Sequence, residues 1–551
     1  MTTDRPVAAE SLREKQAATN RKPFENAVVA AVIVLLLAPS AVWIARDHSV
    51  WPWDQAWYGQ VATDLWFAAT HSLRAWQITM LHAIDMKPPA ITWIGQFFVP
   101  LRGVLGSVEN ALLFSILVTQ GALLWTIFKI GEAVSRSRFV AFTGVVFAAG
   151  AQAFVGLSHQ MFVEPLQALC VAWVVYIAVM CREWPVARSI VHLASALLLG
   201  VAAKTTTPVY CLLFLIYIGG ILLSRRSRPN FHAEWRHWPS RILICLFAPA
   251  AIATSAWYLF TFRAAWRHAR DSSYGDLALH YGFRAALGQK LVIWTRLFDQ
   301  SLLYPFLGWG FLAAALLAAM FVLRSSQRRP APAAILLWLS AAQSALLLLI
   351  FASNITVDAR YMYALVVFVV LLFTGLCGSV PSRWAIAALL LICTMQWGAT
   401  NAVALGARGM FANQFGRLVT PQPDPSQYDE LTRAVQRTSL SNEWTNVIGV
   451  EEPWFNANSA EFFAAEQSLV TGVRSHYIAL GYAQNSVDRA MHRIFSYRAH
   501  YIATLDEPHQ EPRPNYLNLV ALPVLRDMKS DSRFQQIPFS SNKGILLFER
   551  R

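Results

Sequence analysis

The chain has 551 residues, of which 56% are hydrophobic and 14% are charged, and its formal net charge is +14. Soluble globular proteins carry about 25% charged residues, so this deficit and the repeated apolar stretches exclude an ordinary soluble protein and indicate a polytopic membrane protein. Excess Lys and Arg in such a chain marks cytoplasmic loops, and we expect no nucleic-acid partner because no basic soluble domain carries a nucleic-acid motif.

Apolar segments along the chain predict about eleven membrane-spanning helices. They lie near residues 27–45, 109–130, 139–157, 164–181, 189–204, 207–223, 241–261, 301–323, 332–352, 361–378 and 384–400. The basic segment 1–26 is too long to precede the apolar region of a cleaved signal peptide, so we expect a cytoplasmic tail and an uncleaved anchor. With the N-terminus inside, most arginine-rich short loops fall in the cytoplasm, and the high Ala, Arg and Trp content favours a bacterial inner (plasma) membrane.

The first predicted outer loop, residues 46–108, is long and rich in Trp and Tyr. Aromatic side chains of this kind suit the bilayer interface, so we expect short helices that lie on the membrane. One later outer loop, residues 262–300, breaks the charge pattern because it is basic. Its cations are Arg263, Arg267, Arg270, Arg284, Lys290 and Arg296. Either the topology differs there, or the loop binds lipid phosphates.

The tail after the last span alternates short strand-like runs (VIGVE, YIATL, ILLFE) with helix-like runs (AEFFAAEQS, SVDRAMHRIF). This alternation predicts a small α/β domain, and PQPDPSQ at 421–427 has the composition of a linker. The predicted fold is therefore an all-α polytopic membrane protein with interfacial helices and a C-terminal α/β extracytoplasmic domain. Its parts are a tail (1–26), a transmembrane domain (27–404) and a C-terminal domain (405–551).

Two acidic residues on the predicted outer side are candidates for catalysis. Asp54 in WPWDQAWYGQ follows the first span, and apolar Trp and Tyr neighbours would raise its pKa toward the range of a general base. Glu164 in SHQMFVEP comes where a helix should begin, and it would supply a second carboxylate. The alternatives are a hydrated interfacial acid for Asp54 and an acid favoured by the helix dipole for Glu164.

Three cations on the same predicted side could bind a phosphate. Lys87 precedes two prolines in DMKPPAITW, and these hold its backbone extended, although it could also snorkel at the interface or pair with Asp85. Lys204 lies near the end of a span, where an ionisable residue is a functional candidate unless it only ends the helix. Arg360, with Tyr361 beside it in VDARYMY, could instead pair with Asp358.

Three further residues complete the predicted substrate-binding set. They are Tyr58, Asp85 and His159, of which His159 could also be a polar interface residue. Carboxylates and cations gathered at one membrane face predict the handling of a phosphorylated lipid. We find no metal-ligand pattern, and we expect neither a metal nor another cofactor.

The motifs WDQAWY, KPPAITW and ARY resemble those of the GT-C glycosyltransferases, and most closely the protein O-mannosyltransferase and aminoarabinose-transferase-like branch, over residues 25–400. The resemblance implies transfer of a sugar from a polyprenyl-phosphate carrier to an acceptor outside the cytoplasm. It also implies that Asp54 deprotonates the acceptor hydroxyl and that Lys87 lies near the donor phosphate, where Arg360 and Tyr361 assist. Glu164 stands where an Asp is common in the family.

The predicted activity is therefore an inverting, membrane-bound glycosyl transfer from a lipid-phosphate sugar, either hexosyl or pentosyl. The acceptor is left open between a glycan, a lipid and a protein, and membrane lipids are the other expected partners. A transporter or lipid flippase is the alternative from another class, although such proteins favour paired halves with charge at the midplane.

Overall fold

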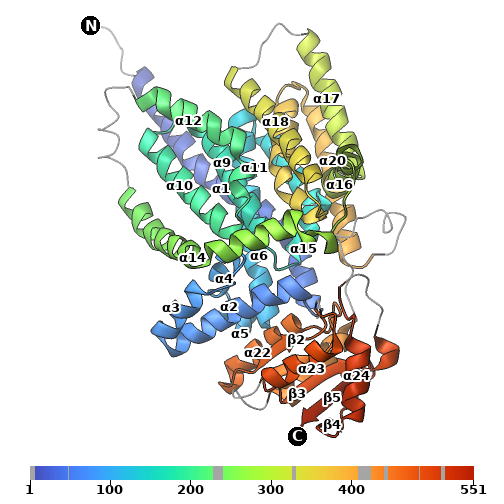
Figure 1. Cartoon of the computed structure of the whole chain (residues 1–551). Coiled ribbons are helices and arrows are strands. Elements are labelled where there is room, and N and C mark those ends of the chain that lie inside the picture. Colours follow the sequence, from blue (N-terminus) through green and yellow to red (C-terminus); the bar gives the residue numbers. More distant parts are fainter. Residues whose placement is uncertain are drawn as a thin grey trace, which may run out of the picture.

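Figure 1 shows the computed structural model of the chain, in which a bundle of long helices carries a smaller sheet domain at one end. The structure describes residues 6–47, 49–226, 240–324, 331–407, 424–439, 445–482, 484–510 and 516–551. Helices α2 to α5, which follow the first apolar helix, lie between the bundle and the sheet domain (Figure 1). The prediction of a helical bundle with a small C-terminal α/β domain is therefore confirmed in outline.

The bundle consists of helices with apolar segments, together with short helices and α14, which joins it from one side (Figure 1). They are α1 Pro6–Arg46, α6 Val108–Ser135, α7 Arg138–Gly150, α8 Gln152–Ser158, α9 Glu164–Met180, α10 Val186–Ala203, α11 Thr207–Tyr210, α12 Leu212–Arg226, α14 Ser240–Tyr274, α16 Leu287–Phe298, α17 Phe306–Arg324, α18 Ala331–Ser353, α19 Val366–Cys377 and α20 Arg383–Ala404. Every predicted span overlaps one of these helices or a pair of them.

The predicted count of eleven spans is not confirmed. In the described part of the chain, six helices are long and apolar enough to cross a membrane, or eight if two bent pairs each form one span. One bent pair, α7 with α8, turns by 63°, and the other, Leu287–Leu303 with Phe306–Val322, turns by 90°. Pro305 lies at the second break, where a residue without a backbone N–H cannot continue a helix. Helices α9 and α12 are apolar but shorter.

Helix α6 lies at the centre of the bundle and packs on α1, α7, α9 and α19. Its neighbours approach closely because small residues face one another. A Cβ added at Gly144 of α7 would meet the Cγ2 atom of Thr374 in α19 at 2.3 Å, which is far inside van der Waals contact. Such helices, buried and apolar on most sides, are typical of a membrane bundle.

The segment 46–108 forms helices, as predicted for the first outer loop. They are α2 Trp53–His71, α3 Leu73–Leu81, α4 Ala90–Gly95, the 3-10 turn η1 Val99–Leu101 and α5 Arg102–Leu105. Helix α3 has no buried residue, and Leu73 and Ile78 are exposed on it. An apolar helix that exposes one side in this way has the character of a helix that lies in the bilayer interface.

The basic segment 262–300 is not a simple loop, because helices continue into it beyond the predicted spans on both sides. Helix α14 continues to Tyr274, the short helix α15 covers Asp276–His280, and α16 already begins at Leu287. In Figure 1, the second half of α14 runs across the end of the bundle, beside the helices of the first outer loop.

The C-terminal domain contains a five-stranded sheet in the order β2-β1-β3-β5-β4. The strands are β1 Thr445–Ile448, β2 His476–Ala479, β3 Tyr501–Leu505, β4 Phe534–Ile537 and β5 Ile545–Arg550. The helices are α21 Pro425–Thr438, α22 Ala457–Thr471, α23 Val487–Ser496 and α24 Ala521–Ser530. Strand β1 pairs in parallel with β2 and β3, whereas β5 pairs antiparallel with β3 and β4. Residues 421–423 of the predicted linker lie outside the described residues, and the remainder begins α21 after the capping side chain of Asp424.

Helix α22 of this domain packs along α2, the helix that contains Asp54. The rings of Trp51 and Phe462 stack with centroids 5.0 Å apart, and the Ser459 hydroxyl donates to the Trp51 carbonyl at 2.7 Å. Gly59 allows this close approach, because a Cβ there would lie 2.8 Å from Trp51 and 3.0 Å from Phe462. The C-terminal domain therefore supports the start of α2 directly.

Candidate active site

The three cations predicted to bind phosphate each form an ion pair with a carboxylate. The Nζ atom of Lys87 lies 2.7 Å from Asp54, that of Lys204 lies 2.9 Å from Glu164, and an Nη2 of Arg360 lies 2.5 Å from Asp358. The pairs come from segments far apart in the sequence and form at the bundle end that faces α2.

The Asp54–Lys87 pair joins the first turn of α2 to the segment before α4. The two prolines of the KPP motif follow Lys87 and directly precede α4. The Lys87 ammonium also lies 5.3 Å from the ring centroid of Trp57 and 6.0 Å from that of Tyr58, so aromatic faces and a carboxylate share it. The Asp54 side chain is 37% exposed and that of Lys87 is 19% exposed, which leaves the pair open to a ligand.

The expected rise in the pKa of Asp54 is wrong. Burial acts to raise the pKa of this carboxyl, but the Lys87 ammonium, with smaller effects from Arg360 and His268, holds the pKa below its ordinary value. A carboxylate with a low pKa is ionised at neutral pH, as a base must be, but it accepts a proton weakly while Lys87 remains in place.

Trp53, immediately before Asp54, has a backbone φ of 36°, in the left-handed region that a bulky side chain rarely adopts. Its indole Nε1 donates to Glu451 of the C-terminal domain at 3.0 Å. Burial raises the pKa of Glu451 to about 7, although the Ala457 backbone and the Trp53 hydrogen bond oppose this rise. Strained backbone of this kind persists only where its surroundings hold it, and here Glu451 is one such contact.

The Glu164–Lys204 pair lies between two helix ends. Glu164 is the first residue of α9 and is 4% exposed at its side chain, and Lys204 directly follows the last turn of α10. Both charges suit the dipoles of those ends, so the helix-end interpretations hold for both residues. The second oxygen of Glu164 has no hydrogen-bond partner among the described residues, and the Lys204 ammonium lies 4.4 Å from the ring centroid of Tyr361.

Arg360 is held by Asp358, as the alternative interpretation of VDARYMY had it. The Nε atom of Arg360 donates to Asp358 at 2.8 Å, and its backbone N–H donates to the same carboxylate at 2.9 Å. The guanidinium carbon lies 4.2 Å from the ring centroid of Phe162. These residues start the turn η3 Ala359–Leu365, where the Tyr361 carbonyl accepts from the Tyr210 hydroxyl at 3.0 Å.

Tyr58 is a residue on which charges from all three ion pairs act. It lies one turn after Asp54 on α2 and is 5% exposed. Burial raises the pKa of its hydroxyl well above the ordinary value, the charges of Asp54 and Glu164 raise it further, and Arg360 opposes them. The charges of the predicted residues Asp54, Glu164 and Arg360 therefore all act on one buried phenol.

Two predicted residues lie apart from this cluster. Asp85 is exposed and lies 3.6 Å from His82, so the suggested pairing of Asp85 with Lys87 is wrong. His159 is buried, stacks on Trp43 of α1 with centroids 4.1 Å apart, and has its Nε2 atom 3.2 Å from the Ser40 hydroxyl. Its described contacts are those of a packed residue between helices.

Sequence reasoning missed His268 and Glu451. Burial lowers the pKa of His268, the Lys87 charge lowers it further, and Asp54 opposes them, so the charges of the Asp54–Lys87 pair act on His268. Its only signal in the sequence was its place within the basic segment 262–300. Glu451 contacts Trp53 across 398 residues of chain, and no local pattern reports such a contact.

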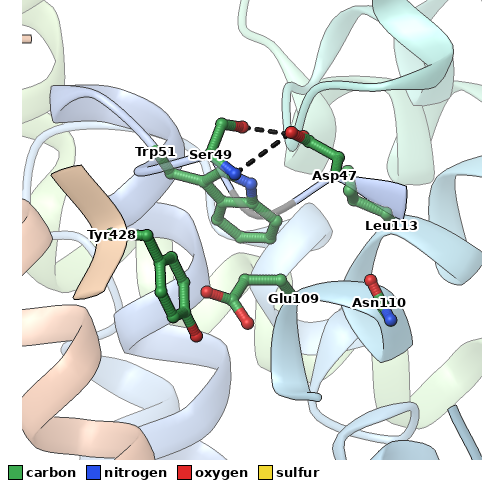
Figure 2. A pocket seen from close by; sticks show the side chains of 7 residues that line it. All are labelled: Asp47, Ser49, Trp51, Glu109, Asn110, Leu113 and Tyr428. Carbon is green, nitrogen blue, oxygen red and sulfur yellow. Dashed lines mark hydrogen bonds between the residues drawn. The ribbon is translucent and has the colours of Figure 1, made fainter. Parts of the chain in front are cut away.

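A small pocket lies where the C-terminal domain meets α6 (Figure 2). Its volume is about 10 Å³, and it is lined by Asp47, Ser49, Trp51, Glu109, Asn110, Leu113 and Tyr428. This is room for about one water. None of its lining residues belongs to the three ion pairs. The pocket lies at the contact between the helical bundle and the C-terminal domain.

The low pKa of Asp54 leads to a pH prediction. Replacing Lys87 with Met removes the positive charge that lowers the pKa of Asp54 most, whereas burial still raises it. The pKa of Asp54 should therefore rise. If the ionised carboxylate is required, the acid limb of the kcat/KM profile lies below about pH 4 in the wild type and moves up by about 1–3 pH units in the variant. Lys87→Arg keeps the charge and should keep the limb in place. An unmoved limb in Lys87→Met would contradict the assignment.

The bundle, the helices at one of its ends and the docked sheet domain together define a polytopic membrane protein with an ArnT-like fold. Similar solved structures include two of ArnT from Cupriavidus metallidurans. The one bound to undecaprenyl phosphate matches with a TM-score of 0.55 and 12% identity over 94% of this chain and 98% of that one. The apo structure matches with a TM-score of 0.54 and 10% identity over 94% and 97%. No protein-family model and no curated relative matches the sequence. At this identity, the likeness establishes the fold.

Proposed function

We propose that the chain is a membrane glycosyltransferase that moves a sugar from a polyprenyl-phosphate carrier to an acceptor outside the cytoplasm. The observation that carries the proposal is the cluster of three cations, each beside a carboxylate, at the bundle end that faces α2. The fold supports it, because ArnT shares this fold and one of its structures is bound to undecaprenyl phosphate. The protein would lie in a bacterial inner membrane, with its N-terminus in the cytoplasm and its C-terminal domain outside.

Asp54 would act as the general base in a single displacement. The acceptor hydroxyl oxygen forms a bond to the anomeric carbon, the bond from that carbon to the phosphate oxygen breaks, and Asp54 takes the hydroxyl proton. Inversion of the anomeric centre follows from one displacement. The phosphate leaves with its electron pair, and Lys87, Lys204 and Arg360 are the positive charges available to stabilise it.

The Asp54–Lys87 contact gives donor binding a direct effect on the base. A donor phosphate that attracts Lys87 weakens the 2.7 Å contact with Asp54. Burial raises the pKa of Asp54, and the Lys87 charge lowers it. When Lys87 turns to the phosphate, its effect weakens, so the pKa of Asp54 rises and the carboxylate becomes a stronger base. The base is thereby strengthened only when the leaving group is in place.

Glu164 would hold Lys204 toward the donor phosphate as the second carboxylate of the site. Glu164→Gln keeps an oxygen that can accept from Lys204 but removes the negative charge. We expect kcat/KM to fall by about tenfold, which corresponds to about 1.4 kcal/mol and to the weakening of one charge-assisted hydrogen bond. Initial rates at varied donor concentration would measure this. If kcat/KM instead fell as far as expected for removal of the general base, the proton transfer would be assigned to Glu164.

The direct test is sugar transfer by the purified full chain. A panel of radiolabelled polyprenyl-phosphate pentoses and hexoses would be offered with membrane extracts that contain glycans, lipids and proteins as acceptors. Transfer of label with inverted stereochemistry supports the proposal and identifies the donor. The rival function, lipid or solute transport, predicts that label crosses the bilayer of a proteoliposome without any change in its chemical linkage.

A further inference from the structure

Helix α14 (Ser240–Tyr274) has two faces of different character past its apolar middle. Trp257, Thr261 and Ala265, spaced by four residues, are buried on one face. The opposite face is exposed, and it changes along the helix from apolar to basic. Leu259 is 85% exposed on it, and Arg263 follows one turn later.

The exposed face carries three arginines in about two turns of helix. Arg263, Arg267 and Arg270 are exposed, and no ion pair joins any of them to a carboxylate in the described part of the chain. They lie at spacings of four and three residues, so they project from one side over about 10 Å. Like charges at this spacing repel one another, and an anionic ligand would relieve that repulsion.

Exposed apolar and aromatic residues accompany these arginines. Phe262 is 58% exposed and Trp266 is 65% exposed, and their rings lie 6.4 Å apart. Aromatic side chains among arginines suit the boundary between lipid headgroups and acyl chains better than they suit open water. Figure 1 shows this half of α14 running across the end of the bundle, where such a boundary would lie.

The buried face of the same helical segment reaches the candidate active site. His268 lies between Arg267 and Arg270 in the sequence but points to the protein, where the charges of Lys87 and Asp54 act on it. The Trp257 indole donates to the Ala83 carbonyl at 2.9 Å, in the segment that leads to Lys87. One short helix segment thus contacts the site on one side and is open on the other.

We propose that Arg263, Arg267 and Arg270 form a binding strip for the phosphate headgroups of anionic membrane lipids, at the bilayer surface next to the Asp54–Lys87 pair. The strip explains why this basic segment lies at the same end of the bundle as the first outer loop, against the usual distribution of positive charge. Lipid binding here does not require sugar transfer, so it can hold or fail independently of the proposed activity.

The test is lipid binding to the full chain in an uncharged detergent, measured by native mass spectrometry with dioleoyl phosphatidylglycerol and no sugar donor. The triple variant Arg263→Gln, Arg267→Gln, Arg270→Gln should lose affinity by on the order of 100-fold, since each arginine near a lipid phosphate is worth about fivefold. The triple Arg→Lys variant should stay within a few fold of the wild type.

A matched control removes three exposed arginines from the C-terminal domain, Arg437, Arg489 and Arg498, each replaced by Gln. It should bind phosphatidylglycerol as the wild type does. Phosphatidylcholine should bind the wild type and the α14 variant equally weakly. The proposal is overturned if the α14 variant keeps its affinity, if the control loses as much, or if inorganic phosphate displaces the lipid at equal concentration, which would indicate a site for free phosphate.

Discussion

Asp54→Asn is expected to lower sugar transfer by about 100- to 10,000-fold, the usual effect of removing a general base. Asparagine has nearly the same size and can still contact Lys87, so α2 should keep its place. The substitution removes the negatively charged carboxylate, whose oxygen lies 2.7 Å from the Lys87 ammonium. This carboxylate is the group that would accept the proton of the acceptor hydroxyl. The effect should appear in kcat, because proton removal occurs in the transition state.

The measurement is transfer of labelled sugar from the donor identified with the wild type, with unfolding temperature as a check on folding. Asp488→Asn is a suitable control, because it makes the same chemical change at an exposed acid on α23. We expect that control to retain wild-type transfer. Full transfer by Asp54→Asn would remove Asp54 from the chemistry and would leave Glu164 as the candidate base.

Arg474→Met is expected to destabilise the contact between the C-terminal domain and α2 by about 3–5 kcal/mol, the usual cost of removing one partner from a buried ion pair. Arg474 contacts Asp64 of α2 at 2.7 Å and Glu461 of α22 at 2.5 Å. Burial acts to raise the pKa of Glu461, and Arg474 is the first of the groups that together hold it below the ordinary value. Without the guanidinium, two carboxylates remain facing each other.

The pH dependence of this contact follows from the same pKa. Since the pKa of Glu461 is lower in the folded chain than in the unfolded one, its stabilisation is present above about pH 4.3 and is lost as the pH falls through the lower folded value. The variant should lack this acid-dependent loss of stability. Denaturant unfolding at several pH values would measure it, and hydrogen exchange in α2 and α22 would locate the change.

Arg526→Met is the matched control for Arg474→Met. Arg526 pairs with Glu507 at 2.5 Å, but the two side chains are 63% and 55% exposed. A pair of this kind contributes about 0–1 kcal/mol. Equal stability loss in both variants would mean that the three-membered contact around Arg474 does not hold the domain on α2. Lower sugar transfer in Arg474→Met alone would connect that docking with Asp54.

Much of the fold was predictable because its signals are local. Apolar runs placed a helix or a bent pair at each predicted span, and the strand-like runs YIATL and ILLFE located β3 and β5. The four-residue strands β2 and β4 were missed, and the run VIGVE overlaps only the last two residues of the equally short β1. The predicted span near 241–261 ended too early, because the amphipathic half of α14 after it reads as a charged loop.

The candidate site was predictable in its residue types but not in its pairings. The motifs around Asp54, Lys87 and Arg360 were visible in the sequence, and Asp358 lies near enough to Arg360 for their contact to be anticipated. By contrast, the contacts of Lys87 with Asp54 and of Lys204 with Glu164 span 33 and 40 residues. Such contacts depend on how helices pack, and helix packing is not encoded in any one segment.

By itself, the sequence determined that this chain is a membrane protein with an aromatic, helical segment after its first apolar helix and with an α/β tail, because hydrophobicity and the pattern of residue types act within a few residues. Only the tertiary structure decided the direction of the Asp54 pKa shift, the contact of Glu451 with Trp53 and the two faces of α14. Each of these depends on burial and on the distance to a charge, and both quantities exist only after distant segments have packed together.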